Sequence, residues 1–204
     1  MSLKFVLREL TIEPSDEWQF SALEKSNIAY LVLFFGTDLT QNESLKERIC
    51  EMSYCSILIT KVIHNLEDFS LSSTSHINIR EGIQYVVGHY YRHLYQSVNF
   101  INDSKLLNYK KKYFYIKTLR GQISTYEQML FYINSISRLG EVWELTRDDE
   151  NLKLISKYNF IKNVPIGAMR DINPNLVYDL VLYENLYDEE LEQILEIRKE
   201  VKYY

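Results

Sequence analysis

The residues best suited to chemistry lie on a helix that the sequence predicts from Asn78 to about Asn102. Helical spacing places His89, Arg92 and His93 on one polar surface, opposite an apolar seam. Arginine offers a rigid fork of donors for a phosphate and histidine titrates near neutral pH, so this surface could bind an anion and move a proton. A solvated helix face is the plainer interpretation. A metal site is not expected, because the two histidines have no glutamate between them and no third ligand nearby.

A second polar set follows the edge of an apolar stripe on a long helix predicted over residues 107–138. Its members are candidates for binding or catalysis and comprise Arg120, Gln122, Glu127 and Asn134. Tyr126, within the apolar stripe itself, is a further candidate binding residue. Arg120 and Glu127 are two turns apart, so each is expected to find a partner on another helix, since half-buried charges are costly unless they are paired. These residues either cross-link helices or line a cleft. We expect antiparallel packing of the two helices to bring both polar sets together.

A basic stretch rich in tyrosine connects the two sets. It contains the candidate binding residues Lys110, Lys111 and Lys112, interleaved with Tyr109, Tyr113 and Tyr115. Cations beside aromatic rings suit single-stranded nucleic acid, so weak and salt-sensitive contact with RNA is one expectation. A solvated helix start would also explain the three lysines.

The elements that position these residues are expected to be helices. Only six glycines and three prolines occur in 204 residues, which is too few for a turn-rich β-sandwich. The predicted helices cover residues 14–36, 44–69, 78–102, 107–138 and an acidic, solvent-facing segment at about 187–202. Residues 4–12 fit either a short strand or a helical turn. The sequence therefore predicts a mainly α protein, a multi-helix bundle in one domain over residues 1–204.

Composition excludes several classes of function. The net charge of −5 gives no overall basic field for nucleic acid. Cys50 and Cys55 form no disulfide framework, which is typical of a cytoplasmic protein. The longest apolar run, residues 28–35, is far shorter than the roughly 20 residues that span a bilayer. Dinucleotide, P-loop and zinc motifs are absent from the sequence, so no cofactor or metal is expected.

Two segments carry a family resemblance. Residues 88–95 read GHYYRHLY and residues 119–127 read LRGQISTYE, and a weaker match covers Lys157-Tyr158 and Lys162-Asn163. Over about residues 20–165 the chain resembles the putative phage abortive infection protein family of bacteria, with Gly121 where that family usually has alanine. The resemblance implies defence against phage, in which an infected cell stops growing or dies before virus is released. It carries over no catalytic residues.

Three classes of function remain open. The first is a phage-defence effector or sensor that acts through binding. The second is a metal-independent ribonuclease in which His89 or His93 transfers a proton and Arg92 or Arg120 holds the phosphate. Because His93 follows Arg92 directly, the chain departs from the HEPN ribonuclease motif, in which the histidine comes four to six residues after the arginine. The third is a helical interaction module without catalysis. The expected partners are RNA, a phage-derived or host protein, or a second copy of the chain.

Overall fold

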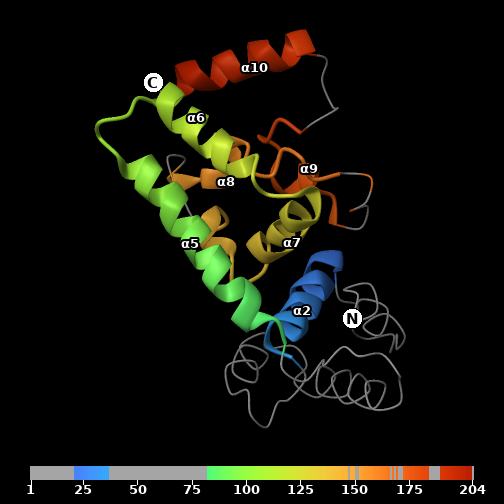
Figure 1. Cartoon of the computed structure of the whole chain (residues 1–204). Helices are drawn as coiled ribbons and strands as arrows, with labels where there is room; N and C mark the ends of the chain where they lie inside the picture. Colours follow the sequence, from blue (N-terminus) through green and yellow to red (C-terminus); the bar gives the residue numbers. More distant parts are fainter. Residues whose placement is uncertain are drawn as a thin grey trace. The chain divides into compact units, whose positions relative to one another are not determined.

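The computed structural model describes residues 21–36, 82–146, 148–149, 152–165, 167, 169, 172–183 and 189–203. These residues contain helices and no strand, which confirms a mainly α protein (Figure 1). Residues 4–12, the helix predicted at 44–69 and both cysteines lie outside the described residues. The chain forms two compact units, residues 1–90 and 91–204, and the single domain stays a prediction. None of the described helices is both long and apolar enough to cross a membrane.

Helix α2 (Ala22–Phe35) belongs to the first unit and begins with a capping box. The Ser21 hydroxyl accepts a hydrogen bond from the backbone N–H of Glu24, whose carboxylate accepts one from the Ser21 N–H at 2.8 Å. The helix therefore starts at Ala22, so the prediction of one continuous helix from Pro14 is wrong, while its predicted end at Gly36 is confirmed. Residues 28–32 are all buried, which explains the apolar run in the sequence.

Helix α5 (Gln84–Asp103) begins later than predicted because of Gly82. Gly82 has a φ of 65°, which favours glycine, and a Cβ atom there would lie 2.4 Å from the carbonyl oxygen of Phe34. A helix that starts near Asn78 cannot continue through this backbone conformation. The predicted end near Asn102 is confirmed.

The helix predicted over residues 107–138 is two helices, α6 (Tyr109–Arg120) and α7 (Thr125–Ser135). Gly121 caps the end of α6 instead of lying within a helix. Ser124 starts α7 with a second capping box, in which the Glu127 carboxylate accepts hydrogen bonds from the Ser124 N–H at 2.8 Å and from its hydroxyl at 2.6 Å. The apolar spacing continues across the break, which is why periodicity alone joined the two helices.

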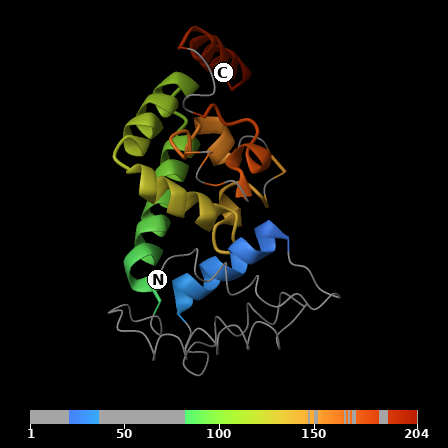
Figure 2. The ribbon, with the colours of Figure 1, turned by 90° about the vertical axis from the view of Figure 1, so that its right-hand side faces the viewer.

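The second unit is completed by short helices and one longer helix. In chain order they are η1 (Glu141–Trp143), α8 (Leu154–Tyr158), α9 (Pro174–Val177) and α10 (Glu189–Lys202). The last of these confirms the helix predicted at the acidic end of the sequence. In both views α10 lies beside α6 (Figure 1, Figure 2). The core is aromatic. The ring centroid of Trp143 lies 4.8 Å from that of Phe131 and 5.4 Å from that of Phe160.

Candidate functional site

The three candidate residues on α5 are exposed. His89, Arg92 and His93 make no hydrogen bond or ion pair within the part of the chain that the structure describes. The carboxylate of Glu127 is engaged by Ser124, and no hydrogen bond or ion pair joins it to Arg92. Among the described residues, no hydrogen bond or ion pair therefore joins the two predicted polar sets. A catalytic role for these residues stays a prediction.

The second polar set divides between surface and interior. Gln122 and Tyr126 are exposed. Asn134 is buried, and its backbone packs closely against Gly140, where a Cβ atom would lie 2.3 Å from the Asn134 carbonyl oxygen. Arg120 is buried at the end of α6 and donates through Nη1 to the carbonyl oxygens of Tyr158 at 3.3 Å and Asn159 at 2.7 Å. Arg120 thus has its partner beyond its own helix, as expected of a buried charge.

Asn159 is the centre of a buried polar cluster that the sequence analysis missed. It is fully buried, has a φ of 50° and caps the end of α8. Its Oδ1 accepts hydrogen bonds from the Leu182 N–H at 3.1 Å and from the Lys199 ammonium, and its Nδ2 donates to the Tyr113 hydroxyl at 3.1 Å. One amide side chain therefore connects α6, α8 and α10. A single asparagine directly after a short helix is the only local signal for this role.

Glu144 and Lys199 extend the cluster on either side of Ser156. The Glu144 carboxylate accepts hydrogen bonds from the Ser156 N–H at 2.7 Å and from the Ser156 hydroxyl. The Lys199 ammonium donates to the Ser156 carbonyl oxygen at 2.6 Å. Burial raises the pKa of the Glu144 carboxyl, and it lowers the pKa of Lys199 to about 8. Lys199 thus joins α10 to α8, and Glu144 joins the end of η1 to α8.

A second buried cluster surrounds Asn102 at the end of α5. Its Oδ1 accepts hydrogen bonds from the Lys157 ammonium at 2.9 Å and from the Tyr158 hydroxyl at 2.8 Å. Its carbonyl oxygen accepts one from the Lys112 ammonium at 2.6 Å, so this candidate binding residue holds the end of α5. Burial, followed by the nearby charge of Lys112, lowers the pKa of Lys157 to about 8.

The buried lysines predict an unusual dependence of stability on pH. Between about pH 8 and pH 10, Lys157 and Lys199 lose their protons in the folded chain but keep them in the unfolded chain, so the free energy of unfolding rises with pH. Above about pH 10 it falls, because the unfolded chain loses protons from tyrosines whose pKa burial raises in the folded state, among them Tyr109 and Tyr178. We expect the melting temperature to rise by about 2–4 °C from pH 7.5 to 9.5, which corresponds to about 1 kcal/mol. Differential scanning calorimetry at each pH measures the melting temperature, and Lys199→Met should make its rise with pH smaller. A melting temperature that falls steadily across this range would contradict the assignment.

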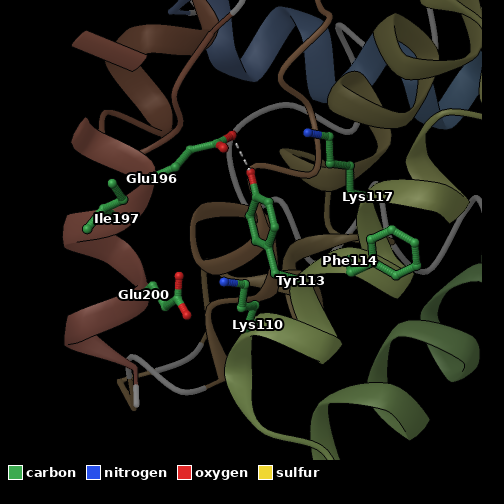
Figure 3. A pocket seen from close by; sticks show the side chains of 7 residues that line it. All are labelled: Lys110, Tyr113, Phe114, Lys117, Glu196, Ile197 and Glu200. Carbon is green, nitrogen blue, oxygen red and sulfur yellow. Dashed lines mark hydrogen bonds between the residues drawn. The ribbon is translucent and has the colours of Figure 1, made fainter. Parts of the chain in front are cut away.

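A groove on the surface of the second unit runs between α6 and α10 (Figure 3). Its volume is about 350 Å³, and its lining consists of Lys110, Tyr113, Phe114, Lys117, Glu196, Ile197 and Glu200. Phe114 is 64% exposed and Ile197 is 60% exposed. The Tyr113 hydroxyl donates to Glu196 Oε1 at 2.8 Å, and the Lys162 ammonium lies 3.7 Å from the same oxygen.

The groove has a basic wall on α6 and an acidic wall on α10, with the Tyr113 ring between them and Phe114 and Ile197 at its two sides (Figure 3). Lys110 and Glu200 lie at one end and Lys117 and Glu196 at the other (Figure 3). Such a lining suits a peptide or protein surface, whereas a polyanion would meet the carboxylates. Of the predicted binding residues only Lys110 lines the groove, and Lys111 is exposed beside it on α6. Among the described residues no three histidine, cysteine or acidic side chains could together hold a metal ion.

The described residues form an α-helical fold with an aromatic core, two buried polar clusters and an exposed groove of mixed charge. Residues 82–169 match the model of the family described as "Putative phage abortive infection protein". The match contains both sequence motifs and the Lys157–Asn163 segment, so it confirms the resemblance from residue 82 onward and supports a role in phage defence. It does not extend to residues 20–81, where the sequence also suggested the resemblance. No curated protein and no solved structure matches the chain.

Proposed function

We propose that this protein acts in phage defence through binding, as an effector or sensor, and that the groove between α6 and α10 is its binding surface. The groove itself is the observation that carries the proposal. Phe114 and Ile197 expose large apolar side chains on the two walls beside charged residues, and exposed apolar surface next to polar groups is typical of interaction sites.

The ribonuclease alternative has weaker support. A general acid or base needs a positioned partner within hydrogen-bond reach of the reacting groups. His89, Arg92 and His93 are exposed and make no hydrogen bond or ion pair with a described residue. The Nη1 atom of Arg120 already donates to two backbone carbonyl oxygens. The positions of these residues favour binding over catalysis.

Phage plaque assays distinguish the two mechanisms. Phe114→Asp places a charge on the apolar part of the groove lining, and we expect it to abolish protection, because losing a large apolar anchor weakens binding by about 2 kcal/mol or roughly 30-fold. Phe100→Asp is the matched control, since Phe100 is equally a surface phenylalanine but lies on α5 outside the groove. It should retain protection.

The double variant Arg92→Ala with His93→Ala completes the design. If the protein acts by binding through the groove, this variant stays folded and protects cells as the unaltered chain does. Loss of protection in this variant, together with full protection by Phe114→Asp, would support the ribonuclease mechanism and refute binding through the groove. Circular dichroism confirms that each variant is folded.

A further inference from the structure

We propose that the occupant of the groove is a second copy of this chain, so that the protein is a two-fold homodimer formed by α6 of each copy against α10 of the other. The inference rests on the proposed function and names its partner. Two independent features of the second unit lead to it: the arrangement of charge in the groove, and the orientation of α10.

The arrangement of charge makes the groove complementary to itself. Lys110, Lys117 and Phe114 line the α6 wall, and Glu196, Glu200 and Ile197 line the α10 wall (Figure 3). In a two-fold arrangement whose axis runs along the groove, the α6 wall of each copy faces the α10 wall of the other. Every lysine then faces a glutamate, and Phe114 faces Ile197 of the partner subunit.

The same charges argue against other occupants. RNA or an anionic membrane would be attracted by two lysines but repelled by two glutamates, so the groove offers a polyanion no net attraction. Lys110, Lys117 and Glu200 make no ion pair within the described residues, so these charges are available to a partner. Glu196 is already engaged by Tyr113 and Lys162, and the pair of Lys110 with Glu200 of the partner subunit therefore contributes most.

The orientation of α10 supplies the second feature. This helix contacts the rest of its unit through polar side chains, with Glu196 bound to Tyr113 and Lys199 bound to Ser156 and Asn159. Its apolar residues Ile197 and Val201 are 60% and 75% exposed. An amphipathic helix normally buries its apolar face. Because Glu196 and Lys199 are half-buried against the unit while Ile197 and Val201 stay exposed, a subunit interface is what would cover these two apolar residues.

Exchange of charges between copies gives a decisive test. Analytical ultracentrifugation of the full chain should show a dimer. K110E should be monomeric where the unaltered chain is dimeric, because like charges then face each other across the interface. E200K should also be monomeric. An equimolar mixture of the two variants should form a dimer, because each lysine of one chain then faces a glutamate of the other. We expect a dimer dissociation constant at least about 10-fold higher for either variant alone, and near the original value for the mixture.

A matched control variant tests whether the loss of the dimer is specific to the groove. K111E makes the same charge change at an exposed position of α6 outside the groove, and it should remain dimeric. A monomeric unaltered chain, or a dimer that K110E and E200K leave intact, would overturn the inference. If in that case Phe114→Asp still abolished phage protection, the groove would bind a different partner and the proposed function would stand.

Discussion

Asn159→Ala should lower the free energy of unfolding by about 3–5 kcal/mol, because it leaves several buried groups without partners. The Leu182 N–H would lose its acceptor, the Lys199 ammonium would lose one of its two acceptors, and the Tyr113 hydroxyl would lose a donor. Alanine also tolerates the left-handed backbone at φ 50° less well than asparagine. Guanidinium denaturation followed by circular dichroism measures the change through the shift of the midpoint.

Asn159→Gly separates the contribution of the side-chain hydrogen bonds to stability from that of the backbone conformation. Glycine adopts the left-handed conformation readily, so this variant should lose the hydrogen bonds but avoid about 1 kcal/mol of backbone strain. We therefore expect glycine to be destabilising, but less so than alanine. Midpoints for both variants that match the unaltered chain would show that Asn159 does not hold α6, α8 and α10 together.

Local signals in the sequence predict where several helices end. Gly36 ends α2 as expected, and the acidic segment forms α10. The break before α7 was missed although Ser124 and Glu127 form a capping-box pattern, because the apolar stripe runs on through the break with helical spacing. The start of α5 depends on the backbone of Phe34 that packs against Gly82, which is a tertiary contact and has no local signature.

The candidate site was predictable only in part. Burial of a charged side chain requires a partner, so the sequence indicated that Arg120 contacts another element. Its partners are backbone carbonyls nearly forty residues further along the chain. This pairing depends on how α6 packs against α8, and local sequence spacing does not predict that packing. The groove was missed for the same reason, since its walls come from helices far apart in the sequence and only the lysine-rich wall was recognised.

Arg120→Met should lower the free energy of unfolding by about 3 kcal/mol, because hydrogen bonds from a charged group contribute about 1.5–3 kcal/mol and both carbonyls lose that donor. The Asn159 carbonyl oxygen would keep only the Lys162 N–H, at 3.1 Å. Methionine keeps most of the apolar volume of the side chain, so the change reports mainly the lost hydrogen bonds. Lys111→Met is the matched control on the exposed side of α6 and should change stability by less than about 0.5 kcal/mol. Chemical denaturation of the three proteins gives both values.

The same Arg120 variant decides whether this residue is structural or part of a phosphate site. If its role is structural, phage protection should decline only as far as the folded fraction declines, and growth of the host at a lower temperature should restore it. If Arg120 instead held a phosphate, the variant would keep a melting temperature near that of the unaltered chain and lose protection at every temperature. The two hydrogen bonds to the end of α8 favour the structural outcome, in which Arg120 positions the α6 wall of the groove without touching a partner.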